Sequence, residues 1–320
     1  MNKPKHLFNI LAVMLLLVPL LAGCGGQGVQ SEDEGIITIS GAFALYPLMV
    51  RWGEEYSNLH PGVQFDISAG GAGKGMTDAL SGAVEIGMVS RDISPEEEAN
   101  GAFWVEVVKD AVFPTISSQN PVYADLMARG ISKEIFVGIF ISGEITTWGQ
   151  VVGRPEITDA IHVYTRSDSC GAAEVWAKFL DNNKQENLLG IGVSADPGLL
   201  DAVVKDPLGI GYNNLNYAFD PSTGLPVAGA GVVPVDANGD GMADASELLE
   251  TKDEAIDAVA TGLYPSPPAR ALNLVTLGKP SGLVLSFLEW ILADGQQYIN
   301  EVGYIPLTAE QIQASQNKLR

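Results

Sequence analysis

The chain has 320 residues, of which 46% are hydrophobic and 18% are charged, and its formal net charge at pH 7 is −21. This length and apolar content predict about two domains with their own cores, while the acidic balance argues against nucleic acid or an anionic membrane surface as a partner. Only two cysteines are present, so we expect no disulfide framework.

The N-terminus predicts export and a lipid anchor. Lys3 and Lys5 precede an apolar run that is too short for a transmembrane span. The run ends in a Leu-Ala-Gly-Cys sequence that resembles the bacterial lipobox, in which Cys24 would be acylated after cleavage. We therefore expect a signal peptide over 1–23, a lipid on Cys24 and a flexible tether over 24–34. An ordinary signal peptide with an incidental cysteine is the alternative.

Strand-like and helix-like runs alternate after the tether, which predicts an α/β fold with a mostly parallel sheet covered by helices. The first set comprises strands over 36–39, 63–67 and 84–89 and helices over 46–59 and 75–80. A second set includes a strand over 161–165 and a helix over 172–180. Near the C-terminus, the apolar spacing predicts one amphipathic helix over 287–302 that ends at Gly303.

Two turns that open helices offer donors for a tetrahedral oxyanion, since bare amides at a helix N-terminus favour an anion. The turn over 70–75 is not a P-loop, because Met76 stands where the magnesium-binding hydroxyl should follow. A plain glycine turn is the alternative reading. The expected contacts from the two turns are Ala42, Phe43, Ala44, Gly71, Ala72, Gly73 and Lys74.

A third turn is more informative because it combines a guanidinium with a helix start. Arg166 follows the expected strand, and Asp168 can hold the plane of its guanidinium. The amides of Cys170, Gly171 and Ala172 would lie at the start of the next helix. The alternative is a surface arginine paired with a nearby aspartate.

Residues 236–247 match the twelve-residue calcium loop of an EF-hand, with a glycine at its sixth position. We interpret this loop as a structural Ca²⁺ site, although an extended segment precedes it and only the residues from Glu247 onward are expected to be helical. A metal-free turn, in which the same side chains cap their own backbone, is the alternative. The expected ligands are Asp236, Asn238, Asp240, Met242 through its carbonyl, Asp244 and Glu247.

Several short motifs occur together in an order that resembles the phosphate-binding proteins of ABC phosphate importers. Each motif is weak alone, but the set extends over nearly all of the chain after the signal peptide. The motifs are Ser40-Gly41, the glycines over 70–73, the segment 86–91, the segment 139–148, the segment 166–171, Tyr264-Pro265 with Arg270, Gly295-Gln296 and the segment 303–307.

The resemblance implies a two-lobed periplasmic-binding-protein fold of type II, an oxyanion held between the lobes and a membrane permease as partner. It places one lobe over 35–113 and 271–320 and the other over 114–270, with the calcium-like loop inserted in the second. It also implies a monomeric, extracytoplasmic binding protein that needs no cofactor to bind its ligand and is not an enzyme.

In the family, the arginine that matches Arg166 contacts phosphate directly. The loop that includes Ser90 and Arg91 matches one that carries a carboxylate, and either Asp92 or the Ser90–Arg91 pair would face the ligand.

The chain departs from the family where hydroxyl side chains are usual. Alanine or cysteine stands at or beside those positions, and each charge-assisted donor that is withdrawn costs a bound oxyanion about 1.5–3 kcal/mol. Phosphate is the expected ligand, but molybdate, tungstate or an organic anion stays open. The positions concerned are Ala42, Ala44, Ala72, Cys170 and Ala172.

Two alternatives come from other functional classes. Cys170 at a helix N-terminus could act as a nucleophile with His162 as its base, although no third group is evident to orient the histidine. A calcium-dependent adhesive surface protein would require the loop over 236–247 to be functional rather than bracing.

Overall fold

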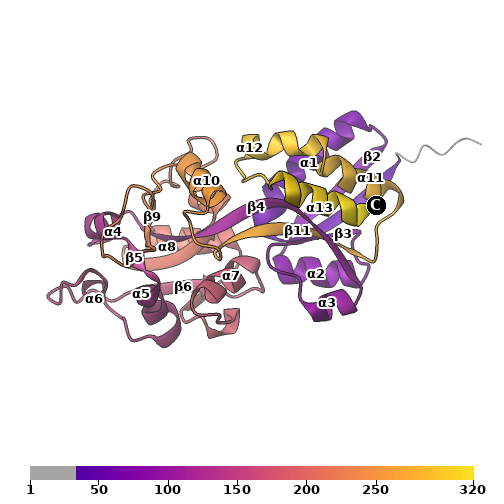
Figure 1. Ribbon diagram of the computed structural model, residues 1–320. Helices are drawn as coiled ribbons and strands as arrows, with labels where there is room; N and C mark the ends of the chain where they lie inside the picture. The colour runs from indigo at the N-terminus through magenta and orange to yellow at the C-terminus, as the bar shows by residue number, and fades with distance from the viewer. Residues whose placement is uncertain (1–33) are drawn as a thin grey trace, which may run out of the picture. The chain divides into compact units, whose positions relative to one another are not determined.

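A mixed sheet of nine strands organises residues 34–320, which are the residues that this computed structural model describes (Figure 1). The predicted signal peptide, Cys24 and almost all of the tether lie outside them. Within them, no helix has the length and apolar character needed to cross a membrane. The strands of the sheet are β1 (Gly35–Gly41), β2 (Val63–Ala69), β3 (Ile86–Val89), β4 (Ala102–Ser117), β6 (His162–Arg166), β7 (Ile191–Val193), β8 (Gly209–Asn214), β9 (Ala230–Val232) and β11 (Ala269–Leu277).

The strand order is β2-β1-β3-β11-β4-β8-β6-β7, with β9 also paired to β4. Pairing is parallel among β1, β2 and β3 and among β6, β7 and β8, whereas β4 and β11 pair antiparallel to each other and to their neighbours. A separate parallel pair joins β5 (Ile131–Ser132) to β10 (Val235–Asp236).

Most helices lie between strands in the chain, as the alternating pattern predicts, and the last three follow β11. They are α1 (Tyr46–Leu59), α2 (Ala72–Leu80), α3 (Pro95–Ala99), α4 (Tyr123–Arg129), α5 (Lys133–Val137), α6 (Trp148–Val152), α7 (Gly171–Phe179), α8 (Asp196–Lys205), α9 (Leu215–Ala218), α10 (Lys252–Thr261), α11 (Gly282–Ile291), α12 (Ile299–Val302) and α13 (Ala309–Leu319).

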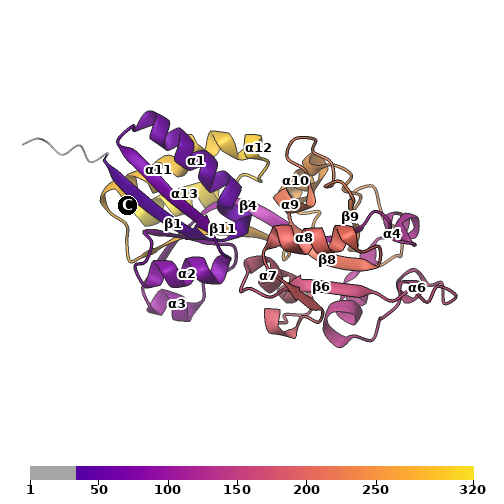
Figure 2. The same ribbon diagram turned by 180° about the vertical axis from the view of Figure 1, so that it is seen from behind.

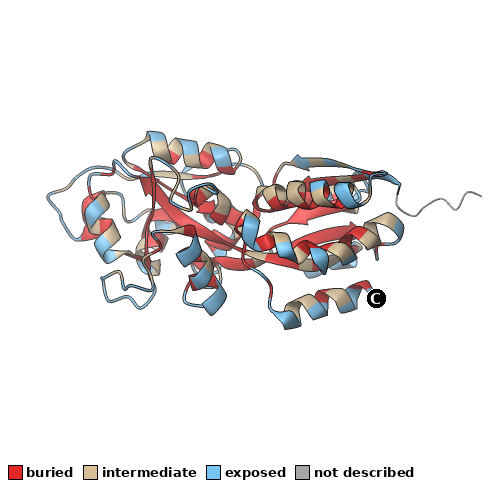
Figure 3. Cartoon of the chain, turned by 90° about the horizontal axis from the view of Figure 1, so that it is seen from above, coloured by how far each residue is buried: buried red, intermediate tan, exposed pale blue. Residues whose placement is uncertain are grey.

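Two hydrophobic clusters form the core, and most strands are largely buried while most helices bury one side (Figure 3). Strands β2 and β7 are partly exposed, and α3 has no buried residue. One cluster includes Trp52 and Phe287, and the other includes Trp148 and Trp176. Only β4 and β11 among the strands of the nine-stranded sheet contribute residues to both clusters, so these two antiparallel strands connect them.

The predicted helix over 46–59 is confirmed residue for residue by α1. Pro47 lies in its first turn, where the missing N–H needs no partner. Leu48, Trp52 and Tyr56 recur at helical spacing and are all buried. The apolar stripe therefore anchors α1 on the sheet and positions the segment that precedes it.

The single helix expected over 287–302 is wrong. The chain forms α11, a 3-10 turn over Asp294–Tyr298 and then α12, which ends at Gly303 with a positive φ of 77°. Tertiary contacts explain the break: the Trp52 indole donates to the Gly295 carbonyl at 2.8 Å, and the Gln296 side-chain Nε2 donates to the Ile291 and Val107 carbonyls. The apolar spacing therefore continues through a segment that is held by side-chain bonds rather than by continuous helical bonds.

Candidate functional site

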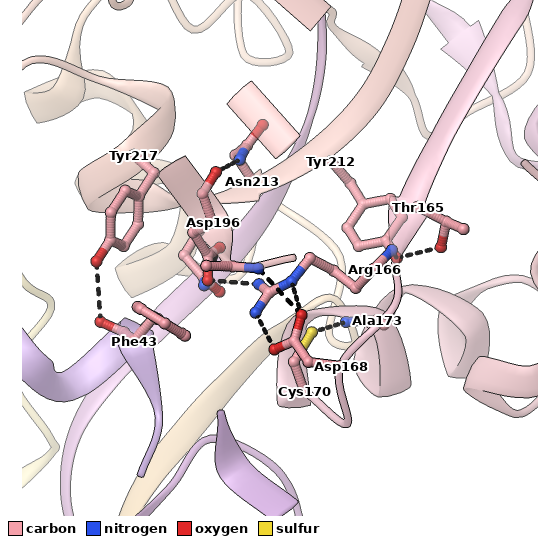
Figure 4. A network of polar contacts seen from close by, with 12 residues as sticks. Phe43, Thr165, Arg166, Asp168, Cys170, Ala173, Asp196, Tyr212, Asn213 and Tyr217 are labelled. Atoms are coloured by element: carbon pink, nitrogen blue, oxygen red, sulfur yellow. Dashed lines mark hydrogen bonds and ion pairs between the residues drawn. The ribbon is translucent and has the colours of Figure 1, made fainter. Parts of the chain in front are cut away.

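Arg166 ends β6, and its side chain is completely buried. Its Nε donates to Asp168 Oδ1 at 2.8 Å, and its Nη2 donates to Asp168 Oδ2 at 2.5 Å. The third bond runs from Nη1 to Asp196 Oδ2 at 2.6 Å (Figure 4). The guanidinium is therefore held by two carboxylates, one of which the sequence predicts.

Asp196 is the partner that sequence reasoning missed. It is the first residue of α8, which packs along β8 (Figure 2), and its side chain is 2% exposed. Its Oδ1 accepts a bond from Asn214 Nδ2 at 2.6 Å, and its carbonyl accepts one from Asn213 at 3.2 Å. An aspartate at a helix start is an ordinary sequence feature, so only the fold reveals that this one faces Arg166.

Burial opposes the ionisation of Arg166 and Asp168, but their mutual attraction and hydrogen bonds outweigh it. The pKa of Asp168 is therefore lowered, and the pKa of Arg166, next to Asp196 and Asp168, is raised well above its ordinary value. The guanidinium and the Asp168 carboxylate thus both carry charge at neutral pH.

The start of α2 meets the loop that follows Arg166. The amide of Gly73 donates to the Ser169 carbonyl at 3.3 Å. Gly71 has a φ of +93°, and a Cβ on it would lie 2.6 Å from the same carbonyl oxygen. Only glycine fits that approach, so the turn that was expected to hold an anion does lie against the Arg166 loop.

Lys74 turns away from this contact. Its ammonium pairs with Asp78, one helical turn further along α2, and about half of its side chain is exposed. Asp78 also accepts a bond from the Ser40 hydroxyl at 2.6 Å. The Lys74 ammonium is therefore engaged with Asp78 in this structure.

Phe43 brings the segment before α1 to the same place. Its ring lies 5.5 Å from the Arg166 guanidinium carbon, within cation–π range. Its carbonyl accepts a bond from the Tyr217 hydroxyl at 3.4 Å. Its neighbours Ala42 and Ala44 are buried in the hydrophobic cluster.

The three residues at the end of β3 have different surroundings. Ser90 is buried against the start of α7, where a Cβ on Gly171 would lie 2.2 Å from its carbonyl oxygen. Arg91 pairs with Glu97 at 2.7 Å and with Glu174 at 3.0 Å. Asp92 is 83% exposed and pairs with Lys178 at 2.6 Å. Of the three, Ser90 lies nearest to the α7 amides.

Cys170 is the N-cap of α7. Its Sγ accepts a bond from the Ala173 amide at 3.3 Å, and its own amide donates to Gln185 Oε1 at 3.1 Å. The next two amides, of Gly171 and Ala172, belong to the first turn of a nine-residue helix and have no intrahelical partner. The helix dipole adds partial positive charge at this point.

The surroundings of Cys170 do not suit a nucleophile. Burial raises the pKa of its thiol to about 12, in spite of the nearby Arg166. His162, the expected base, instead contacts Asp206 through Nδ1 at 2.7 Å and is about half exposed. The thiol is therefore neutral at physiological pH and has a different partner from the one that catalysis would need.

Side chains of the calcium-like loop turn toward their own backbone. Asp236 accepts bonds from the amides of Gly239 and Gly241 at 2.7 and 3.0 Å, and Glu247 accepts bonds from those of Ala237 and Asp244 at 2.8 and 3.0 Å. Helix α10 begins at Lys252, five residues later than expected.

The chain is similar in sequence and in fold to known proteins. A family model described as a PBP superfamily domain matches residues 28–295. The chain belongs to this superfamily. The phosphate-binding protein PstS of Bacillus subtilis (strain 168) is 26% identical over 321 residues, which cover 96% of each chain. PstS of Methanocaldococcus jannaschii is 26% identical over 357 residues, covering 92% of this chain and 90% of that one.

Solved structures of other proteins have the same architecture. A Clostridium perfringens protein, provisionally described as a phosphate ABC transporter substrate-binding protein and solved with bound phosphate, has a TM-score of 0.68 at 22% identity and covers 86% of this chain and 100% of its own. An ABC-type phosphate transport receptor from Vibrio cholerae has a TM-score of 0.61 at 19% identity. The predicted periplasmic-binding-protein fold is thus confirmed. The relatives are phosphate-binding transport proteins, so the expectation of a non-enzymatic protein is confirmed as well.

Proposed function

We propose that this protein is the extracytoplasmic solute-binding component of an ABC importer and that it binds phosphate. The observation that carries the proposal is the meeting of three helix starts around Arg166: Phe43 before α1, Gly73 in α2 and Gly171 in α7. Helix N-termini and a buried guanidinium together suit a small oxyanion. The relatives in the same superfamily that bind phosphate support the choice of ligand.

Backbone amides supply most of the attraction in this account. Arg166 carries one positive charge and its partners Asp168 and Asp196 carry two negative charges, so the side chains of the trio sum to −1. The anion must therefore be attracted by first-turn amides, chiefly those of Gly171 and Ala172, with Arg166 as the neighbouring cation. Such local donors act within a Debye length of about 8 Å, which separates them from most of the acidic surface.

Some of the remaining predicted contacts are free to meet an anion, and others already pair with different side chains. Ser90 can donate its hydroxyl to an anion at the α7 start. Arg91 and Asp92, the other two residues of this loop, are engaged with other side chains. Lys74 would have to leave Asp78 to reach the anion. Alanine or cysteine stands at several positions in the three turns where hydroxyl donors are usual in the family, so molybdate, tungstate and organic anions belong in any binding comparison.

The anion enters by separation of the two hydrophobic clusters. Gly73 contacts Ser169, and Gly171 contacts Ser90, so segments from the two clusters are pressed together at the site. Opening would take place about β4 and β11, which connect the clusters. We propose lobes over 35–113 with 271–320 and over 114–270, and on β4 the change from one cluster to the other falls a few residues before the end of the first lobe, between Val108 and Ala111.

The rest of the proposal concerns location and partners. The lipobox-like sequence would place the mature chain outside the cytoplasmic membrane, held through lipid on Cys24, as a monomer that delivers its anion to a membrane permease. A structural Ca²⁺ in the loop over 236–247 is a separate proposal that rests on the sequence pattern alone.

Isothermal titration with phosphate tests the binding site. Arg166→Lys keeps the charge but loses the forked donor geometry, so we expect at least about tenfold weaker binding. Arg154→Lys is the matched control, since Arg154 pairs with Asp125 and Glu156 on the surface, and it should bind phosphate like the parent. Equal affinity of both variants would contradict the role given to Arg166.

A further inference from the structure

Asp110 and Arg270 lie where the two hydrophobic clusters meet. On β4, Val108 belongs to one cluster and Ala111 to the other, and on β11 the change falls between Ala269 and Leu272. Arg270 pairs in register with Asp110 across these strands, and Arg270 Nη2 lies 3.4 Å from Asp110 Oδ2. This ion pair therefore occupies the point about which the clusters would move.

A chain of buried contacts joins that pair to the anion site. Arg166 Nη1 donates to Asp196 Oδ2, and Asp196 Oδ1 accepts from Asn214 Nδ2, both at 2.6 Å. The Asn214 oxygen in turn accepts from Arg270 Nη2 at 2.5 Å. All four residues are at most 8% exposed. The contacts are thus continuous from Arg166 to β11.

Asn214 is suited to its place because its amide has two different ends. The NH₂ group donates to a carboxylate, and the carbonyl accepts from a guanidinium. An aspartate here would set like charge against Asp196, and an apolar residue would break both bonds. An asparagine can therefore transmit a displacement of Asp196 to Arg270.

Arg270 is held incompletely. Its Nε and Nη1 are buried and have no hydrogen-bond partner among the described residues, a costly state for donors out of water. Its position thus depends on Asn214 and Asp110, so a shift of either partner changes the guanidinium's environment.

We propose that Asn214 and Arg270 are positioning residues that couple the anion at Arg166 to closure about β4 and β11. This inference rests on the proposed function. An anion that draws Arg166 toward the α7 start would pull Asp196 and, through Asn214, set Arg270 against Asp110 in the closed geometry. Loss of the link would leave the anion contacts in place but weaken their effect on the connecting strands.

Amide hydrogen exchange with and without saturating phosphate tests this coupling. In the parent, phosphate should slow exchange in β4 and β11 as well as at the start of α7. In Asn214→Leu, protection at the α7 start should persist, while protection in β4 and β11 is lost and the Kd for phosphate rises about tenfold, within the usual range of coupling between sites.

Asn213→Leu is the matched control. Asn213 is equally buried, but it bonds the Asp196 carbonyl and Thr115 rather than the Asp196 carboxylate and Arg270. A general loss of packing would affect both variants alike, so the control should keep phosphate-dependent protection in β4 and β11. Arg270→Lys, which keeps the charge, should retain part of it and serves if Asn214→Leu does not fold.

The outcomes separate the two proposals. Full phosphate-dependent protection of β4 and β11 in Asn214→Leu, or the same loss in both asparagine variants, would overturn the coupling while leaving phosphate binding intact. A parent that neither binds phosphate nor changes its exchange would overturn the proposed function itself.

Discussion

Arg166→Ala should destabilise the protein strongly because the substitution leaves Asp196 buried without its cation. Three charge-assisted hydrogen bonds disappear, at 2.5, 2.6 and 2.8 Å. Asp168 is 22% exposed and can be hydrated in part, whereas Asp196 at 2% cannot. Breaking a buried ion pair by deleting one partner costs about 3–5 kcal/mol, and most of that loss should come from Asp196.

A second substitution tests this reasoning. In Arg166→Ala, changing Asp196→Asn removes the unpaired charge and keeps the side-chain oxygen that accepts from Asn214. We expect the double variant to regain about 1–3 kcal/mol relative to Arg166→Ala. Asp196→Asn alone should be destabilising, because Arg166 then keeps only Asp168 as an ionic partner.

Urea unfolding at pH 7, followed by tryptophan fluorescence, measures all four free energies of unfolding. The five tryptophans include Trp176, which is buried in α7 next to this network. A double variant no more stable than Arg166→Ala would refute the assignment of the cost to Asp196. A loss below about 1 kcal/mol in Arg166→Ala would show that the pair is hydrated like a surface pair.

Four further predictions concern other parts of the chain. Burial raises the pKa of Asp110 to about 6 despite Arg270, so the free energy of unfolding of the parent should fall as pH rises from about 4 to about 6 and the buried carboxyl ionises. The free energy of unfolding of Asp110→Asn, measured in urea, should therefore rise relative to that of the parent over this range. A difference between the two that does not change with pH would contradict the prediction. If residues 236–247 bind Ca²⁺, adding Ca²⁺ to metal-free protein should raise Tm, and Asp240→Ala should abolish the rise. Equal Tm values of the parent with and without Ca²⁺ would contradict the proposed calcium site. Cys24→Ala should move the protein from the membrane to the soluble or unprocessed fraction, and unchanged partitioning would end the anchor hypothesis. In that same variant, Cys170 should resist alkylation by iodoacetamide at pH 8 until urea unfolds the chain, because burial raises the pKa of its thiol to about 12. Rapid labelling of Cys170 in the folded protein would contradict this prediction.

Local patterns were enough to predict much of the fold. The strand and helix that flank the loop after Arg166 are expected at 161–165 and 172–180 and found as β6 and α7, because each has a clear apolar pattern and the turn between them is polar. The bond between Arg166 and Asp168 is similarly local, since two residues separate them.

Contacts between residues far apart in the chain could not be predicted from the sequence. Asp196 is thirty residues from Arg166, and nothing in its surroundings distinguishes it from any aspartate that begins a helix. The break after α11 depends on Trp52, more than two hundred residues away in the chain. Such features arise when the sheet brings distant segments together, and a single sequence contains no signal for that pairing.

Arg91 shows the same limit at the site. Its family motif left either Asp92 or the Ser90–Arg91 pair to face the ligand, and its guanidinium pairs with Glu97 and Glu174, neither of which stands out in the sequence. The order of motifs thus predicts where the site lies, but the distribution of charges around it depends on partners contributed by other elements.

The most direct test of the account is isothermal titration of phosphate into the purified protein after removal of any bound anion by unfolding and refolding. One phosphate should bind per chain, without turnover, and Arg166→Lys should weaken that binding while Arg154→Lys should not. A folded parent that binds no phosphate, or one that binds it equally well after Arg166→Lys, would contradict the proposal that the helix starts around Arg166 form the anion site.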